Sequence, residues 1–273
     1  MADSTRRPFN AYSDPDFLKS RDARPLRILS EYIEPATRFE RFGIKDTIVF
    51  FGSARIVPRE IAEKGVAVAR EAGTGIKTAE RALQMSRYYE DARTLAYRLT
   101  EWSKGLGEEA GGRRFVVCSG GGPGVMEAAN RGASEARGLN IGLNITLPFE
   151  QAENPYITNH LAFNFHYFFM RKLWFMYLAK AIVIFPGGFG TIDELFEVAT
   201  LMQTGKVKKP MKLVLYGMNY WRDVINFEAL VEHGTIEPDD LKLFTMVDDV
   251  DSAYMAIVDH LSGRAIDEPG PKL

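Results

Sequence analysis

Residues 181–194 read AIVIFPGGFGTIDE, and the fold class of the whole chain follows from this segment. The first five residues are apolar and three of them are β-branched, a pattern typical of a short strand buried on both faces. Pro186 to Gly190 carry few side-chain atoms, so the backbone there can approach a ligand closely. We expect a helix to begin at Thr191. A strand, a glycine loop and a helix N-terminus together predict an anion site, here the phosphate end of a nucleotide site.

The rest of the chain repeats this alternation of short apolar strands and helices. Strands are also expected at residues 47–51, 115–118, 141–147, 211–216 and 244–247, and helices at 26–42, 58–70, 78–102, 124–137, 167–178, 191–202, 220–232 and 250–261. Such alternation is typical of a parallel sheet with helices on both faces. We predict an α/β fold, a Rossmann-like doubly wound parallel sheet forming a single domain at 46–262. An N-terminal arm and helix (1–45) and a C-terminal tail (263–273) flank it.

The composition of the chain excludes several classes of protein. The 273 residues are 46% apolar and 26% charged, with a formal net charge of −2, which gives no electrostatic reason to expect nucleic-acid binding. The single cysteine, Cys118, excludes an internal disulfide and fits a reducing compartment. The apolar region 161–185 is interrupted by Arg171, Lys172 and Lys180, so we expect no membrane span. We therefore expect a cytoplasmic protein that binds neither nucleic acid nor membrane.

A second glycine loop, SGGGPG at residues 119–124, follows the strand predicted at 115–118. Neither loop has the G-x-G-x-x-G spacing of dinucleotide-binding folds, and neither is a P-loop. Each loop taken alone is also explained as a tight turn between a strand and a helix. Two such loops on one parallel sheet favour a binding site, because ligands gather at the carboxyl ends of the strands.

Glu194 has two interpretations. Thr191 and Glu194 have the spacing of a capping box, in which the glutamate accepts the N–H of the first residue of the motif. Glu194, Glu197 and Thr200 also form a stripe along one helix face, so the acids could line a cleft.

Arg171 and Lys172 interrupt a strongly apolar predicted helix. Charges in such a segment cost free energy unless they are paired, face a ligand, or extend to the helix surface. The histidines lack metal-like spacing, so we expect no metal site. Cys118 has no catalytic partner by sequence, and core packing explains it.

Four motifs in order carry a resemblance to a known family. Residues 186–194 (PGGFGTIDE) match the PGGxGTxxE signature of the Lonely guy family, the cytokinin-activating phosphoribohydrolases often mislabelled lysine decarboxylases. Residues 170–172 (MRK) precede it at the spacing of the family's Arg-Lys pair. Residues 119–127 resemble its other glycine loop and residues 51–53 its first strand turn. The chain resembles a longer, bacterial-type member, because the short plant-like members lack its N-terminal extension and long 78–102 helix.

The resemblance implies an enzyme that hydrolyses N-glycosyl bonds without a cofactor. Its substrate would be a nucleoside 5′-monophosphate, cleaved as by an AMP nucleosidase to ribose 5-phosphate and free base, adenine or a cytokinin. Family members are homodimers or larger, and the aromatic-rich stretch at 163–177 favours the same assembly. By this resemblance Arg171 and Glu194 are catalytic. The implied substrate-binding residues are Ser53, Gly121, Gly122, Met126, Lys172, Gly187, Gly188, Phe189, Gly190, Thr191 and Thr200.

The chemistry of this reaction suits the residue types. Cleavage of an N-ribosyl bond passes through an oxocarbenium-like state, which a nearby carboxylate stabilises. Glu194 could hold ribose hydroxyls, stabilise positive charge or activate water. Arg171 is a poor proton donor, since its pKa is above about 12, and is assigned to charge neutralisation and positioning. The alternative is a non-catalytic nucleotide or cofactor carrier, which needs the glycine loops but not both Arg171 and Glu194. The sequence leaves the preferred base open.

Overall fold

The computed structural model describes residues 10–106, 112–147, 153–265 and 267–271. Residues 1–9 of the predicted arm lie outside the described residues. The described part forms one sheet of seven parallel strands in the order β4-β3-β2-β1-β5-β6-β7. The strands are β1 (Thr47–Phe51), β2 (Val116–Ser119), β3 (Asn140–Ile145), β4 (Ala162–Phe165), β5 (Ala179–Ile184), β6 (Lys212–Tyr216) and β7 (Phe244–Val247).

The order of the strands confirms the doubly wound topology. The chain runs outward from β1 to β4, returns to the centre as β5 beside β1, and then continues outward through β6 and β7. The direction of winding therefore reverses between β1 and β5. At such a switch point the connections leave in opposite directions and a crevice opens beyond the strand ends.

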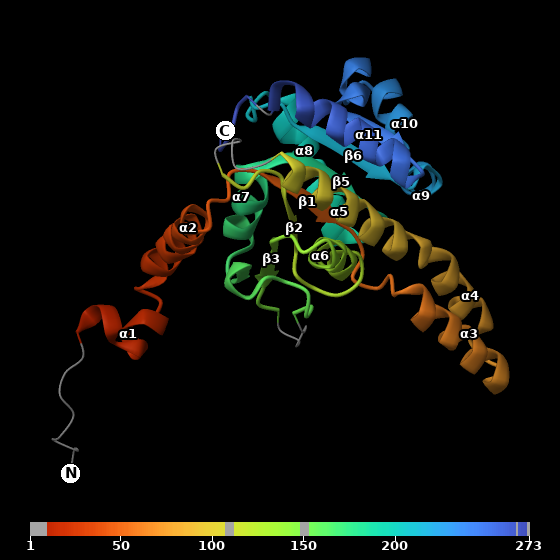
Figure 1. Ribbon diagram of the computed structural model, residues 1–273, viewed down its shortest axis with the longest axis horizontal. Coiled ribbons are helices and arrows are strands. Elements are labelled where there is room, and N and C mark those ends of the chain that lie inside the picture. The colour runs from red at the N-terminus through yellow and green to blue at the C-terminus, as the bar shows by residue number, and fades with distance from the viewer. Residues whose placement is uncertain (1–9, 107–111, 148–152, 266, 272–273) are drawn as a thin grey trace, which may run out of the picture.

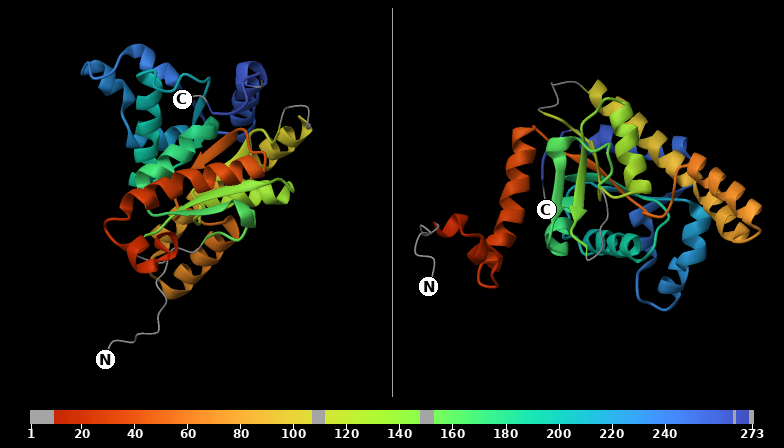
Figure 2. Two further views of the ribbon diagram at one scale, coloured as in Figure 1. Left: turned by 90° about the vertical axis from the view of Figure 1, so that its left-hand side faces the viewer. Right: turned by 90° about the horizontal axis from the view of Figure 1, so that it is seen from below.

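Helices cover both faces of the sheet (Figures 1 and 2), as predicted. The core of one face includes side chains of α2 (Arg24–Arg41), α7 (Phe168–Leu178), α8 (Phe189–Gln203), α9 (Met218–Val224) and α10 (Phe227–Glu232). The other core includes side chains of α5 (Arg87–Gly105), α6 (Val125–Glu135) and α11 (Val250–His260). Along β5, Ile182 and Ile184 face the first core while Ala181 and Val183 face the second. This alternation explains why the strand is apolar at every position.

Three sequence-based expectations differ from the structure. The helix expected at 78–102 is two helices, α4 (Ile76–Met85) and α5, which meet at Ser86. The Ser86 hydroxyl donates to Leu83 O over 2.7 Å, a local bond that competes with regular helix geometry. The helix expected at 220–232 is likewise α9 and α10. Residues 162–165, for which no strand is predicted, form the edge strand β4, in which Phe163 is buried and Asn164 exposed.

The N-terminal extension supports α7. Before α2, residues 11–19 form a short 3₁₀ turn and the helix α1 (Pro15–Lys19). The Glu31 carboxylate of α2 accepts the backbone N–H groups of His166 (2.8 Å) and Tyr167 (3.2 Å), just before α7 begins. The Trp174 indole of α7 donates to Glu31 O over 3.0 Å. A carboxylate at a helix N-terminus is stabilising, so α2 fixes the position of α7.

The C-terminal segment returns to the opposite end of the sheet from the glycine loops. Gly270 N donates to Asp46 Oδ1 over 3.1 Å, and Lys180 Nζ donates to Glu268 O over 2.7 Å. Asp46 also pairs with Arg114. Across the described residues, no helix combines the length and apolar character that a membrane crossing requires.

Candidate functional site

A cleft of about 1170 Å³ opens at the switch point between β1 and β5. The loops that follow three strands are hydrogen-bonded to one another beneath it. Ser53 N, after β1, donates to Pro186 O after β5 over 3.0 Å. Val125 N, after β2, donates to Ser53 O over 3.1 Å. The two glycine loops and the turn after β1 therefore form one continuous floor, as the positions of the motifs predict.

The helix after the second glycine loop begins earlier than expected. Helix α8 starts at Phe189, its N-cap is Gly188, and no side chain caps it. The predicted capping box is therefore wrong, because Thr191 and Glu194 both lie inside the helix and Glu194 is beyond its first turn. The glycines explain the early start. A Cβ at position 187 would lie 2.1 Å from the Thr191 hydroxyl oxygen, so only glycine lets the chain turn this tightly.

The N-terminal turn of α8 is open to the cleft. Gly188 and Gly190 are exposed, and a Cβ at either position would meet nothing within 4 Å. The first N–H groups of a helix have no partner within the helix, and the positive end of its dipole lies here. This geometry suits a phosphate group. Phe189 is 94% exposed and also lines the cleft.

Glu194 and Arg171 meet in the cleft, one from α8 and one from α7. Arg171 Nη2 lies 3.9 Å from Glu194 Oε1, and both residues line the cavity. Glu194 is only 6% exposed, and burial raises the pKa of its carboxyl to about 7, although Lys172 and Arg171 oppose this rise. Such a group exchanges protons near neutral pH.

Arg171 is held between aromatic rings and keeps unused hydrogen-bonding capacity. Its guanidinium carbon lies 5.1 Å from the ring centre of Phe168 and 5.6 Å from that of Phe175. Its Nε is buried and has no hydrogen-bond partner within the described chain. Burial lowers the pKa of Arg171, but arginine remains charged at physiological pH. A buried, unpartnered donor beside Glu194 is a group that a ligand can satisfy.

The structure brings most of the predicted site residues together, but not all. Among them, the residues that line the cleft are Ser53, Gly122, Met126, Arg171, Gly187, Gly188, Phe189, Gly190, Thr191 and Glu194. Lys172 points elsewhere: its ammonium lies 2.8 Å from Asp193 Oδ2 and 2.7 Å from Glu197 Oε2, so it joins α7 to α8. The Thr200 hydroxyl donates to Phe196 O, within α8. Neither of these two residues lines the cleft.

Gly121, the remaining predicted residue, lies behind the cleft surface and has a structural requirement for glycine. Its φ is +72°, and a Cβ there would lie 2.3 Å from Asn144 Oδ1. The buried amide of Asn154 donates to Gly121 O over 3.0 Å and to Gly122 O over 3.2 Å. Asn130 accepts from both Asn154 and Ser119. This buried network fixes the backbone of the first glycine loop.

Sequence reasoning missed several residues of the cleft. Tyr220 of α9 lines it, and its hydroxyl donates to Gly187 O over 2.6 Å, which fixes the second glycine loop. Asn144 and Asn164 line it from the ends of β3 and β4, and Arg55 and Arg81 line its outer part. The only sequence signal was position: Asn144 and Asn164 lie at the carboxyl ends of strands. Among the described residues, no group of three or more His, Cys, Asp or Glu could hold a metal ion.

Comparisons with known proteins agree with the motifs. A family model described as "Possible lysine decarboxylase" matches residues 126–257. The cytokinin riboside 5′-monophosphate phosphoribohydrolase of Rhodococcoides fascians is 29% identical over 125 residues, 45% of this chain and 60% of the relative. The enzyme of the same name, LOG7, of Arabidopsis thaliana is 38% identical over 61 residues, 22% of this chain and 28% of the relative. The matched regions thus span less than two thirds of either relative.

Two solved structures are similar over most of this chain. A structural-genomics target, TM1055, matches 78% of this chain and 99% of its own with 20% identity and a TM-score of 0.46. The Moco carrier protein of Chlamydomonas reinhardtii matches 80% of this chain and 98% of its own with 19% identity and a TM-score of 0.39. Both TM-scores are below 0.5, so neither likeness bears on function. The family model and the curated relatives confirm the resemblance to the Lonely guy family that the motifs predict.

Proposed function

We propose that this protein hydrolyses the N-glycosidic bond of a nucleoside 5′-monophosphate, releasing the free base and ribose 5-phosphate. The observation that carries the proposal is the pairing of a buried acid, Glu194, with a half-buried cation, Arg171, at 3.9 Å. Both lie in the cleft that also contains the open N-terminus of α8. A nucleotide needs the helix end for its phosphate, and the scission of its glycosidic bond needs the carboxylate.

Each group has a distinct role in the proposed reaction. The backbone N–H groups at Gly188, Phe189 and Gly190 bind the 5′-phosphate. The bond between C1′ and the base nitrogen breaks with its electron pair going to the base, and positive charge develops on the ribose. The Glu194 carboxylate stabilises this charge and accepts a proton from the water that adds to C1′. Arg171 keeps part of Glu194 ionised and binds the substrate through its unused donors. The departing base takes its proton from solvent.

The two curated relatives support this class of reaction, since both are named as phosphoribohydrolases of a nucleoside monophosphate. The preferred base, adenine or a prenylated adenine, is left to experiment. A non-catalytic carrier would need the helix end and the glycine loops only. The buried Glu194 disfavours the carrier, because an acid removed from water costs stability and a carrier gains nothing from it.

The test is to incubate the purified protein with nucleoside 5′-monophosphates and to follow free base by chromatography. We expect AMP to be cleaved and adenosine to remain nearly untouched, because the α8 N-terminus binds only the phosphorylated substrate. Equal rates with AMP and adenosine would contradict the assigned phosphate site. Binding of AMP with no release of base from any nucleotide of the panel would support the carrier instead.

We also propose a homodimer. Phe168 and Phe169 of α7 are 50% and 52% exposed, and large apolar side chains in this position favour a contact with a second copy. Light scattering at micromolar protein concentration should give at least twice the mass of one chain. A monomer under these conditions would contradict the proposal.

A further inference from the structure

The cleft is larger than a nucleoside monophosphate requires. Its volume of about 1170 Å³ exceeds the range of roughly 300 to 1,000 Å³ that is usual for small-ligand pockets. Glu194, Arg171 and the α8 N-terminus line one part of it. The helix α4 lines another, through Thr78, Arg81, Ala82 and Met85. This second part has no role in the reaction proposed above.

Helix α4 contributes to the cleft but little to the core, against which only its half-buried Met85 packs. It forms a hairpin with α3 (Arg59–Ala72) that is inserted between β1 and α5 and projects from the body (Figure 1). None of the residues of α4 is buried, and α3 buries only Ala62 and Val66. The hairpin therefore adds little buried surface to the core around the sheet.

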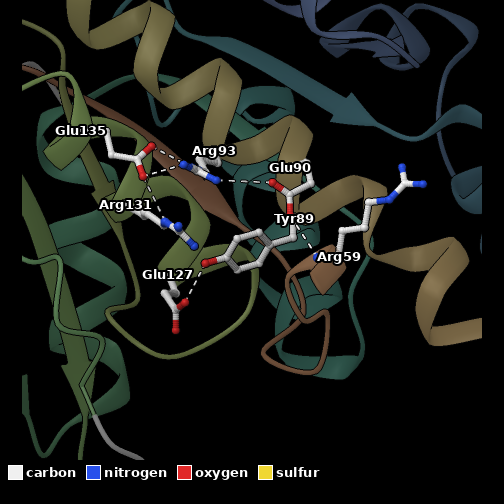
Figure 3. Close-up of polar contacts among 7 residues, drawn as sticks. All are labelled: Arg59, Tyr89, Glu90, Arg93, Glu127, Arg131 and Glu135. Atoms are coloured by element: carbon white, nitrogen blue, oxygen red, sulfur yellow. Dashed lines mark hydrogen bonds and ion pairs between the residues drawn. The ribbon is translucent and has the colours of Figure 1, made fainter. Parts of the chain in front are cut away.

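The base of the hairpin is nevertheless held firmly (Figure 3). The Glu90 carboxylate of α5 accepts the backbone N–H of Arg59, the first residue of α3, over 3.0 Å. Arg93 of α5 lies 3.6 Å from Glu90 and makes two 2.7 Å hydrogen bonds to Glu135 of α6. An acid at the helix N-terminus and a bidentate ion pair behind it fix the start of α3 against α5 and α6.

Two arginines line the cleft without an acidic partner. Arg55, in the turn after β1, and Arg81 of α4 are exposed, and neither forms an ion pair with a described residue. Their neighbours on the hairpin and on α5 behave differently, because Arg59, Arg70, Arg87, Arg93 and Arg98 all pair with acids. The acids that line the cleft are Glu153 and Glu194.

The turn that carries Arg55 is tied to the phosphate-binding turn. Ser53 N donates to Pro186 O, and the Ser53 hydroxyl accepts Arg55 N over 3.1 Å. Arg55 therefore lies two residues after Ser53, which is bonded to the second glycine loop, and Arg81 of α4 lines the same cleft. A chain of phosphates that starts at the α8 N-terminus can extend along this turn.

We propose that Arg55 and Arg81 form a second anion subsite, which binds the distal phosphates of nucleoside 5′-di- and triphosphates. The location of the first phosphate rests on the proposed function. Guanidinium groups bind phosphate oxygens through paired charge-assisted hydrogen bonds, so each arginine strengthens the binding of a nucleotide that reaches it. The protein then binds ADP and ATP more tightly than AMP.

The test is a calorimetric titration of AMP, ADP and ATP, without divalent metal, into the full-length Glu194→Gln protein, in which the nucleotides stay intact. We expect ADP to bind at least about tenfold more tightly than AMP. In the added double variant Arg55→Ala/Arg81→Ala, the affinity for ADP and ATP should fall to that for AMP, and AMP binding should change less than about threefold. Lys77→Ala, which removes a cation of α4 outside the cleft, should change none of the three affinities.

Several outcomes would overturn the subsite. One is equal affinity for ADP and AMP in the starting protein. Another is a loss of AMP binding in the double variant as strong as the loss of ADP binding, which would assign the arginines to the first phosphate. An equal loss with Lys77→Ala would indicate general charge attraction. Failure of the proposed function gives a different result, because AMP and ADP would then still differ in affinity while the native protein releases no base.

Discussion

We expect Glu194→Gln to lower the turnover of AMP by roughly a hundredfold or more and to leave the fold intact. The amide has the shape of the carboxylate but no charge, so it cannot stabilise the oxocarbenium-like state or accept the proton of the attacking water. Glu194 lies inside α8, and no helix cap depends on it. Steady-state release of adenine, measured beside binding of AMP, separates the loss of chemistry from a loss of binding.

The same variant changes how stability depends on pH. The pKa of Glu194 is raised from 4.5 to about 7 in the folded protein, so the folded state holds this proton more tightly than the unfolded state. Protonated Glu194 therefore contributes to the free energy of unfolding below pH 4.5. This contribution, on the order of 3 kcal/mol in all, is lost as the pH rises to about 7. Glutamine does not ionise, so urea denaturation should show a smaller fall in stability between pH 5 and pH 8.

Asp193→Asn provides the matched control for this experiment. Asp193 precedes Glu194 on α8 and carries the same charge, but it pairs with Lys172 and does not line the cleft. Its substitution should keep turnover within a few-fold of the parent. If Glu194→Gln retained near-normal turnover, the proposed mechanism would be wrong. If both variants lost turnover equally, the net charge of α8 rather than the Glu194 carboxylate would be responsible.

Arg171→Ala should reduce kcat/KM for AMP by a hundredfold or more and move the pH profile upward. Arg171 lowers the pKa of Glu194, so its removal raises that pKa further. The reaction requires ionised Glu194, and kcat/KM should therefore rise through a pH of about 7 in the parent and through a higher pH in the variant. AMP binding weakens as well, because the buried donors of the guanidinium are lost. Steady-state rates measured from pH 5 to pH 9 give both the fall in kcat/KM and the shift of the pH profile.

Arg171→Lys separates charge from geometry. Lysine restores a positive charge near Glu194 but lacks the planar set of donors. The pH profile should return toward that of the parent, while the affinity for AMP should recover only in part. The rise of kcat/KM with pH could also stay at the same pH in Arg171→Ala as in the parent. That result would show that Arg171 and Glu194 are not electrostatically coupled in the working enzyme.

The sequence was sufficient for six of the seven strands and for the convergence of the two glycine loops, but it did not predict the edge strand β4. The short apolar runs of the strands, their alternation with helices and the glycine loops at their carboxyl ends predict a doubly wound parallel sheet with one cleft. Arg171 and Glu194 lie in different predicted helices. The resemblance to the Lonely guy family, rather than any local pattern, predicted that they belong to one site. Their 3.9 Å separation depends on how α7 packs beside α8, which local sequence does not encode.

Other features were missed for identifiable physical reasons. Thr191 has the chemistry of an N-cap, but the glycines before it allow the helix to begin at Phe189. Tyr220 reaches Gly187 through a tertiary contact between α9 and the loop after β5. Arg81 resembles any exposed arginine of an amphipathic helix, since only the break at Ser86 and the projection of the hairpin place it in the cleft. The positions of Tyr220 and Arg81 depend on packing between elements distant in the chain, whereas the early start of α8 follows from its own glycines.

The position of β5 beside β1 has a consequence for how the chain is made. On the ribosome, β1, β2, β3 and β4 emerge before β5, although β5 pairs with β1 at the centre of the finished sheet. Until residues 179–184 are synthesised, one edge of β1 presents unpaired backbone groups among the buried side chains of Ile48, Val49 and Phe50. Such an edge invites pairing with other chains, and distant pairings fold slowly. A nascent chain that ends before β5 therefore lacks both the floor of the cleft and protection against aggregation.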